Sequence, residues 1–359
     1  MEYNNKIDLI IPVYNVDKKL FIKCLSSVVQ QHIIDDVLVT IVDDASTDTT
    51  AFQEVIDIFS PILNIQILRM DKNGGPGVAR QYGIDHTHNE FIVFMDADDM
   101  FYNAFALERM RGAINSLDNK GNKFKMATSQ FCEILAEQED TPDVTNFWHV
   151  DEGDMVWLFG KIYRREVIEA FNIRFHPTSR ANEDNGFNAQ MQLCLEKEEV
   201  NQFPDCTYYW NHNPNSITRK DNGKYAYDGS EDASFHGYVI NMKYAVEQAR
   251  KNNPNNIEYI NLYACQVMVH LYAYYLECYD ASRETVNQNL EWCKLYYKTI
   301  FKDTYSLLNE EQLMIFTESY YSSAALPRVP REKLSIPHIT FWQFIDLCKE
   351  DYVNYEEEK

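Results

Sequence analysis

The residues best suited to chemistry are the three carboxylates of the segment Asp96-Ala97-Asp98-Asp99. The segment follows an uncharged run, Phe91 to Met95, which predicts a buried central strand. In open α/β sheets, ligands bind outside the carboxyl ends of the strands, where these side chains would lie. Carboxylates this close repel one another, and a divalent cation that prefers oxygen ligands removes the repulsion. The segment predicts a Mg²⁺ or Mn²⁺ site that binds a nucleotide diphosphate; taken alone, it could also be a solvated acidic turn.

Three further strands are expected in the amino-terminal half. The first begins at Ile7 and should stop at Pro12, because proline cannot donate to a sheet ladder. The second covers Val37–Val42 and the third Ile65–Leu68, and Pro76 suits the first turn of a following helix. Four strands that alternate with segments of helical length predict a parallel sheet built from βαβ units, and therefore an α/β fold.

Polar segments follow these strands. Asp43-Asp44-Ala45-Ser46 forms a turn after the second strand. Asn73-Gly74-Gly75-Pro76 follows the third, and its glycines allow close backbone approach and positive φ. Arg80 would lie on the helix that begins there.

Seven segments, in this order and spacing, resemble family 2 of the inverting glycosyltransferases. They are I-I-P-V-Y-N from Ile10, V-D-D-A-S-T-D from Val42, N-G-G-P-G-V-A-R from Asn73, F-M-D-A-D-D from Phe94, W-L-F-G-K-I-Y-R-R from Trp157, N-E-D-N-G-F from Asn182 and Y-Y-W-N-H-N-P-N-S-I-T from Tyr208. The resemblance implies the GT-A fold, a Rossmann-like nucleotide-sugar-binding domain with a D-x-D motif. Two departures are Ala45, where the family has glycine, and Gln81, where it has asparagine.

The expected metal ligand is Asp98, because Mg²⁺ and Mn²⁺ sites rich in phosphate oxygens favour a carboxylate at a strand end. Asp96 would contact the ribose or a metal-bound water, and Asp99 would hold the loop or the donor sugar. By resemblance, His212 is a third contact to metal or diphosphate, although a lone histidine can equally be structural. Lys161 would neutralise diphosphate charge or cap a helix. The donor-binding residues so implied are Pro12, Val13, Tyr14, Asp44, Arg80, Asp96, Ala97, Lys161 and Ser216.

Inverting transfer is a single displacement that needs a base for the acceptor hydroxyl proton. We expect Asp184 to be this base, since it precedes an apolar helical stretch, Phe187 to Leu195, that would hold it rigidly. Glu183 is the next candidate. A first-turn acid is also favoured by the helix dipole, which is the structural reading of Glu183.

The chain changes character after about Lys224, so residues 1–224 are expected to form the GT-A domain and 225–359 a helical subdomain. Helical periodicity covers Glu231–Arg250, Ile257–Cys278, Glu284–Phe301, Glu310–Ala325 and Thr340–Tyr352. Tyrosines recur in these helices, where they pack, stack on sugars or meet a partner. Exposed ones would be compatible with a homo-oligomer.

The composition limits which partners the protein is expected to bind and which cellular compartment it is expected to occupy. With 359 residues, a formal charge of −22 and no basic run, the sequence weighs against nucleic acid and anionic lipid as partners without excluding them. The longest apolar stretch, Leu262–Leu276, contains polar residues and is shorter than the ~20 residues of a spanning helix. Eight cysteines without a C-x-x-C pair, and no signal peptide at residues 1–6, predict a reduced, cytoplasmic protein.

The sequence thus predicts a metal-dependent hexosyltransferase that uses a nucleotide-diphospho-sugar, specifically a UDP-sugar, and a glycan or another hydroxyl acceptor. A sugar-1-phosphate nucleotidyltransferase is the alternative enzyme, but it needs a glycine-rich segment where Pro12-Val13-Tyr14-Asn15 stands. A non-catalytic nucleotide-sugar-binding or scaffold protein is the third reading. Intact Asp98 and Asp184 argue against it.

Overall fold

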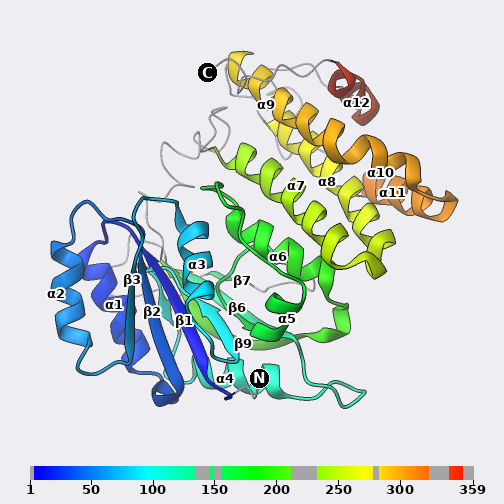
Figure 1. Cartoon of the computed structure of the whole chain (residues 1–359). Helices are drawn as coiled ribbons and strands as arrows, with labels where there is room; N and C mark the ends of the chain where they lie inside the picture. Colours follow the sequence, from blue (N-terminus) through cyan, green and yellow to red (C-terminus); the bar gives the residue numbers. More distant parts are fainter. Residues whose placement is uncertain are drawn as a thin grey trace. The chain divides into compact units, whose positions relative to one another are not determined.

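The computed structural model describes residues 4–134, 146–148, 155–211, 233–277, 283–322 and 339–350. The chain divides into two compact units, described separately below (Figure 1). The first comprises residues 1–180 and 187–215, and the second comprises residues 181–186 and 216–359.

The first unit is built on one mixed sheet, whose described strands run in the order β3-β2-β1-β4-β8-β6-β9-β5, with β7 paired to β6. Strands β1 to β4 are mutually parallel, as predicted, and β8 then pairs antiparallel to β4. The strands are β1 (Ile7–Val13), β2 (Val37–Asp43), β3 (Ile65–Arg69), β4 (Phe91–Phe94), β5 (Met100–Phe101), β6 (Met126–Ile134), β7 (Asn146–Trp148), β8 (Lys161–Arg164) and β9 (Val200–Asn211).

Strand β1 does not stop at Pro12. It continues through Val13, whose carbonyl accepts a hydrogen bond of 2.9 Å from the Asp44 amide on the β2 side. Successive residues of a strand turn their backbone groups to opposite neighbours, so Pro12 faces the β4 side. There the pairing with β4 ends at Ile10, so the missing proline N–H breaks no ladder bond.

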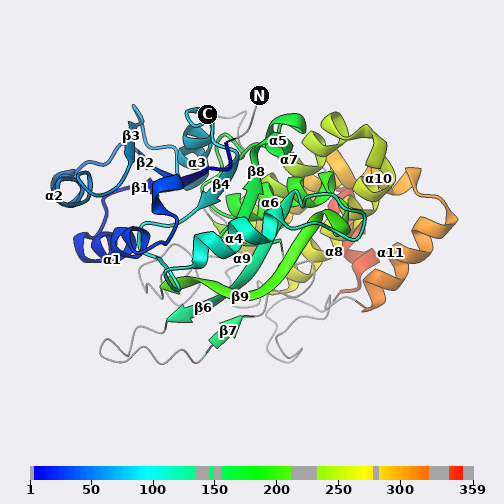
Figure 2. The same cartoon turned by 90° about the horizontal axis from the view of Figure 1, so that it is seen from below.

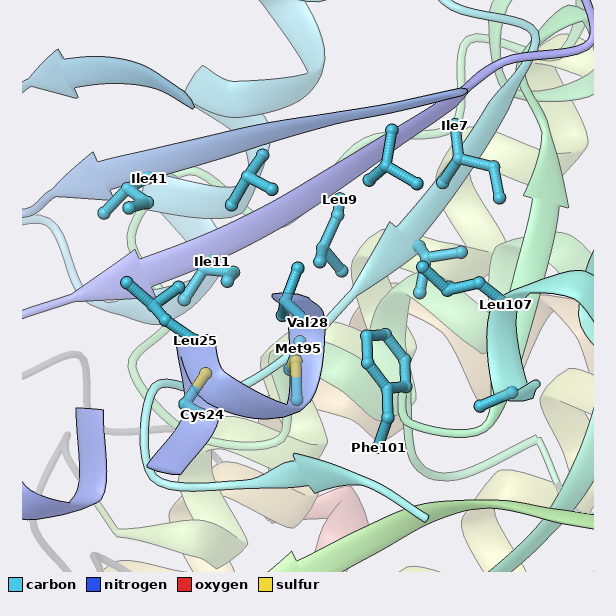
Figure 3. Close-up of a cluster of buried hydrophobic side chains, with 14 of the residues drawn as sticks. Ile7, Leu9, Ile11, Cys24, Leu25, Val28, Ile41, Met95, Phe101 and Leu107 are labelled. Atoms are coloured by element: carbon cyan, nitrogen blue, oxygen red, sulfur yellow. The ribbon is translucent and has the colours of Figure 1, made fainter. Parts of the chain in front are cut away.

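Helices cover both faces of this sheet. One face carries α1 (Lys18–Val29), α2 (Thr50–Phe59) and α4 (Ala106–Asn115), and Figure 3 shows β1 and α1 side chains of this core. The other carries α3 (Pro76–Asp85), α5 (Arg165–Ala170) and the first-unit part of α6 (Glu183–Cys194). Leu9 and Ile11 belong to the first core and Ile10 to the second. This alternation follows from the period of two along a strand. Short 3₁₀ turns are η1 (Ile34–Asp36) and η2 (Lys197–Glu199).

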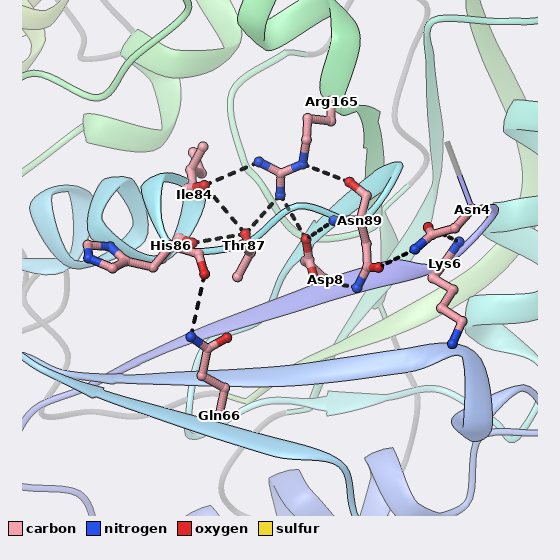
Figure 4. Close-up of polar contacts among 10 residues, drawn as sticks. Asn4, Lys6, Asp8, Gln66, Ile84, His86, Thr87, Asn89 and Arg165 are labelled. Carbon is pink, nitrogen blue, oxygen red and sulfur yellow. Dashed lines mark hydrogen bonds and ion pairs between the residues drawn. The ribbon is translucent and has the colours of Figure 1, made fainter. Parts of the chain in front are cut away.

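Arg164 and Arg165 connect β8 and α5 to the amino-terminal ends of the parallel strands, and Figure 4 shows the contacts of Arg165. Arg165 Nη2 lies 2.8 Å from Asp8 Oδ2 and 2.8 Å from Thr87 Oγ1, and both charged side chains are buried. Arg164 Nη1 lies 2.5 Å from Glu90 Oε1. These pairs stand at the opposite end of the strands from Asp96, so they fix the sheet without occupying the predicted ligand edge.

The second unit is helical in its described part (Figure 2). Its helices are α7 (Ser234–Asn252), α8 (Ile257–Glu277), α9 (Arg283–Tyr296), α10 (Lys302–Leu307), α11 (Glu310–Ser322) and α12 (Phe341–Lys349), with the turns η4 (Pro254–Asn256) and η6 (Tyr297–Phe301). The third predicted helix does not end at Phe301, because a π-helical turn there continues into α10. At α12, Thr340 forms the expected helix start as a capping box with Gln343.

Two tyrosines of this unit, Tyr272 and Tyr296, pack inside it. Tyr272 donates to the Ile339 carbonyl over 2.6 Å, and Tyr296 donates to the Ala264 carbonyl over 3.0 Å. Both rings are buried. No helix in the described ranges combines the length and the apolar character needed to cross a membrane.

Candidate active site

Residues Asp96 to Asp99 form a tight turn directly after β4, here called the acidic turn. It is closed by the Asp99 amide, which donates to the Asp96 carbonyl over 3.1 Å. Asp99 is buried, and its two carboxylate oxygens accept from the Tyr208 hydroxyl (2.7 Å) and the Asn211 amide (2.7 Å). Burial raises the pKa of Asp99 well above its ordinary value, and Asp96 and Asp98 raise it further. Asp99 therefore ties the turn to β9, whereas Asp96 and Asp98 are only half-buried.

Arg80 joins helix α3 to the acidic turn. Its Nη2 lies 2.5 Å from Asp96 Oδ1. The arginine side chain is 6% exposed and that of Asp96 is 40% exposed. A buried cation beside these carboxylates offsets part of their mutual repulsion. The position predicted for Arg80, on the helix that follows the glycine-rich segment, is the observed one.

Asp44 is held by the glycine-rich segment. Its Oδ1 accepts from the Gly74 amide (2.7 Å) and its Oδ2 from the Gly75 amide (2.8 Å). Gly75 has φ +88°, a conformation that only glycine adopts readily. Burial raises the pKa of Asp44, while the two amides and the charge of Arg180 oppose the shift. Each carboxylate oxygen can accept a second hydrogen bond, so Asp44 can still bind a ligand donor.

The loop after β1 lies against the loop after β2. Asn15, with φ +47°, accepts from the amides of Thr47 (2.9 Å) and Asp48 (3.2 Å) through its side-chain oxygen. Its own amide donates to Ser46 Oγ over 2.9 Å. Ala45 has φ +56°, in the left-handed region that favours glycine. The two loops thus form one hydrogen-bonded rim beside Asp44.

Of the other predicted donor-binding residues, Pro12, Val13 and Tyr14 lie at the carboxyl end of β1, next to that of β2, and Ala97 lies in the acidic turn. Val13 is buried, while the Tyr14 side chain at the end of β1 is exposed. Lys161 is buried as the first residue of β8, where it pairs with Thr128 of β6. His212 and Ser216 lie outside the described residues. Pro12 and Ala97 are half-buried.

The candidate base belongs to the second unit, at the start of α6. Asn182 has φ +56°, and its side-chain amide donates to the Ser234 carbonyl over 2.6 Å. A Cβ at Gly186 would lie 2.6 Å from Asn241 Oδ1, so only glycine lets α6 begin this close to α7. Asp184 Oδ1 accepts from the next amide in the chain over 2.8 Å, and Glu183 is buried. The helix start that bears both acids is thus fixed against α7.

For the expected cation, the described residues contain no group of three acidic, histidine or cysteine side chains placed to hold a metal. Asp96 and Asp98 supply two carboxylates on one turn. Mg²⁺ is commonly bound by one or two carboxylates together with substrate phosphates and water. The residues present therefore fit a cation shared with a nucleotide diphosphate.

Sequence reasoning missed three contributors to this site. Tyr208 lies in a segment used for the resemblance, yet its bond to Asp99 spans 109 positions along the chain. Gly74 and Gly75 were expected to allow close backbone approach, but their amides were not identified as donors to Asp44. The Asn15 side chain was assigned no role, because backbone donors and turn geometry leave little trace in residue type. The sequence feature that could have pointed to Tyr208 was the pair Tyr208-Tyr209, which opens the last of the seven segments.

Comparison with known proteins identifies related sequences and a related fold. Residues 8–149 match the sequence family described as glycosyl transferase family 2. The glycosyltransferase EpsJ of Bacillus subtilis is 28% identical over 222 residues, which are 59% of this chain and 62% of EpsJ. TarS of Staphylococcus aureus, a poly(ribitol-phosphate) β-N-acetylglucosaminyltransferase, is 25% identical over 57% of this chain and 35% of TarS. The chain thus matches less than two thirds of the length of each relative.

The fold has a close solved counterpart. The crystal structure of S. aureus TarS 1–349 in complex with UDP-GlcNAc superposes with a TM-score of 0.66, over 89% of this chain and 88% of that one, at 15% identity. The mixed α/β sheet and the carboxyl-terminal helices are therefore parts of a known architecture. Residues 8–149 thus match glycosyl transferase family 2, and the chain has a mixed α/β fold of the GT-A type with a helical carboxyl-terminal region.

Proposed function

We propose that this chain transfers a hexose from a UDP-sugar to an acceptor hydroxyl, with inversion and in the presence of Mn²⁺ or Mg²⁺. The observation that carries the proposal is the gathering of Asp44, Arg80 and the acidic turn at the carboxyl ends of β2 and β4. The donor class is supported by TarS, which is named for N-acetylglucosamine transfer and was solved with UDP-GlcNAc.

Some of the proposed donor-binding residues would contact the uracil ring, and others would act at the diphosphate. Asp44 would accept a hydrogen bond from the N3–H group of uracil. Asp96 and Asp98 would hold the cation, which supplies charge neutralisation on the departing diphosphate, and Arg80 would keep the carboxylates in place. The remaining proposed donor contacts are Pro12, Val13, Tyr14, Ala97, Lys161 and Ser216, with His212 as a third contact to metal or diphosphate.

Asp184 would take the proton from the acceptor hydroxyl as that oxygen attacks the anomeric carbon. Its place at a helix start favours the ionised carboxylate, as a base requires. Glu183 is the second candidate. The acceptor we propose is a hydroxyl of a glycan or a polyol-phosphate polymer, a class supported by the acceptor in the name of TarS.

The deciding experiment incubates the purified chain with Mn²⁺, a panel of UDP-, GDP-, CDP- and dTDP-sugars and candidate acceptors, and measures release of nucleoside diphosphate. Release from a UDP-sugar that increases with acceptor supports the proposal, and Asp98→Ala should abolish it. Pyrophosphate release from UTP and a sugar 1-phosphate would instead identify a nucleotidyltransferase. Tight UDP binding without turnover of any donor would indicate a non-catalytic binding protein.

A further inference from the structure

One hydroxyl group contacts both ends of the acidic turn. Tyr208 Oη donates to Asp99 Oδ2 over 2.7 Å and lies 3.2 Å from the Asp96 amide nitrogen, from which it accepts. A phenol can donate one hydrogen bond and accept another at the same time. The first and last residues of the turn are therefore joined through a single atom of a side chain on β9.

Tyr208 is itself held rigidly. It is 1% exposed, and its ring stacks on Phe159 with a centroid distance of 5.1 Å and an interplanar angle of 16°. Its backbone pairs with Phe101 of β5 and with Phe131 of β6. A second bond from β9, donated by the Asn211 amide, reaches Asp99 Oδ1 over 2.7 Å. The hydroxyl thus has a fixed position from which to hold the turn.

The turn needs such a restraint. It carries Asp96 and Asp98 one residue apart, and like charges at this separation favour a conformation that moves them away from each other. Binding groups act best when their geometry is fixed before the ligand arrives, because no free energy is then spent on ordering them. With both oxygens of Asp99 accepting from β9, the third carboxylate of the motif serves as an anchor.

We propose that Tyr208 is a positioning residue that clamps the acidic turn, through Asp99 and the Asp96 amide, in the conformation that binds the metal and the donor diphosphate. The expected effect of Tyr208 on UDP binding rests on the proposed function. Its expected effect on the conformation of the acidic turn does not. The clamp acts through Asp99 and does not itself touch the donor.

The test compares Tyr208→Phe with the wild-type chain and with Tyr209→Phe as a matched control. Both variants lose one phenolic oxygen from adjacent residues of β9, but the Tyr209 ring packs against Tyr102, with a centroid distance of 4.8 Å. Hydrogen–deuterium exchange of residues 95–99 reports on the turn. We expect about ten-fold faster exchange there in Tyr208→Phe, the effect of losing roughly one hydrogen bond, and unchanged exchange in β1.

UDP titrations with and without Mn²⁺ give the second readout. Tyr208→Phe should weaken UDP binding about ten-fold in Mn²⁺ and leave metal-free binding, which relies on Asp44, nearly unchanged. A general loss of packing would weaken UDP binding both with and without Mn²⁺. Combining Tyr208→Phe with Asp99→Asn should add little to Asp99→Asn alone, because the two side chains act as a unit.

Exchange at residues 95–99 that stays at the wild-type rate in Tyr208→Phe overturns the clamp, as does equal acceleration in β1 or an equal effect of Tyr209→Phe. If the wild-type chain shows no Mn²⁺-dependent UDP binding and no transfer, the proposed function fails. The exchange rates then still decide whether Tyr208 holds the turn.

Discussion

Asp8 and Arg165 are 157 positions apart in the sequence, yet their side chains form a buried ion pair with an Nη2–Oδ2 distance of 2.8 Å. The Asp8 side chain is 0% exposed and that of Arg165 is 4% exposed. The pair closes the amino-terminal end of the sheet, where Asn89 and Thr87 complete its hydrogen bonds. The acidic turn and Asp44 follow the opposite, carboxyl ends of these strands.

Arg165→Met should lower the free energy of unfolding by about 3–5 kcal/mol, because it leaves the Asp8 carboxylate buried without its cation. Urea denaturation measures the loss. The control is Arg174→Met, whose partner is Asp85 and whose pair is 40% and 39% exposed, so about 1 kcal/mol or less is expected. Similar losses in both variants would contradict this account of the buried pair.

Ala45→Gly should stabilise the chain by up to about 1 kcal/mol, because Ala45 occupies the left-handed region at φ +56°, which disfavours a side chain. Thermal or urea unfolding detects the change. Ala113→Gly, inside α4, is the control and should destabilise by about 1 kcal/mol. A lower unfolding midpoint for Ala45→Gly would show that the alanine conformation is not strained.

UDP should bind more tightly than CDP by about 1–3 kcal/mol, because the Asp44 carboxylate can accept from N3–H of uracil and cytosine has no such donor. Isothermal titration calorimetry measures both affinities. In Asp44→Asn the preference should largely disappear, since an amide can donate to cytosine N3 as well as accept from uracil. Equal affinities in the wild-type chain would mean that the base is read by another group.

The same preference should depend on pH. Burial raises the pKa of Asp44 above its ordinary value, so the carboxylate is protonated at a higher pH than an exposed aspartate. A protonated Asp44 no longer accepts well from uracil but can donate to cytosine N3. The UDP preference should therefore shrink as pH falls toward this raised pKa, and it should not change in Asp44→Asn.

Chelation should abolish transfer. Asp96 and Asp98 stand one residue apart, and their repulsion in the presence of a diphosphate requires a compensating cation. EDTA should remove UDP release, and added Mn²⁺ or Mg²⁺ should restore it, whereas EDTA that is already saturated with Mn²⁺ is the control for non-specific effects of the chelator. Full activity in EDTA would rule out the metal requirement.

Asp184→Asn should reduce the transfer rate by about 10²–10⁴-fold, the usual contribution of a general base, because the amide keeps the shape but takes no proton. UDP affinity should hardly change. Asp98→Ala is the contrasting variant and should weaken Mn²⁺-dependent UDP binding as well as turnover. Parallel loss of rate and UDP binding in Asp184→Asn would remove its assignment as base, and Glu183 would be tested next.

Much of the amino-terminal half could be predicted from the sequence, because its signals are local. The apolar runs of β1, β2 and β4, the proline that opens α3 and the glycines that admit positive φ each act within a few residues. Carboxyl ends of parallel strands meet at one edge, so the pattern also brought Asp44 and the acidic turn to the same side. The helical periodicity of residues 234–277 could likewise be recognised in the sequence.

The tertiary structure alone decided which long-range contacts hold the strands and the acidic turn in place. Strands β8, β6 and β9 extend the sheet with mixed direction, and their pairing depends on contacts between residues far apart in the chain. That order brings Tyr208 to Asp99 and Arg165 to Asp8. Residue type records that a tyrosine or an arginine is present, but its partner is set by strand order and burial, since an unpaired polar group inside the core would be costly.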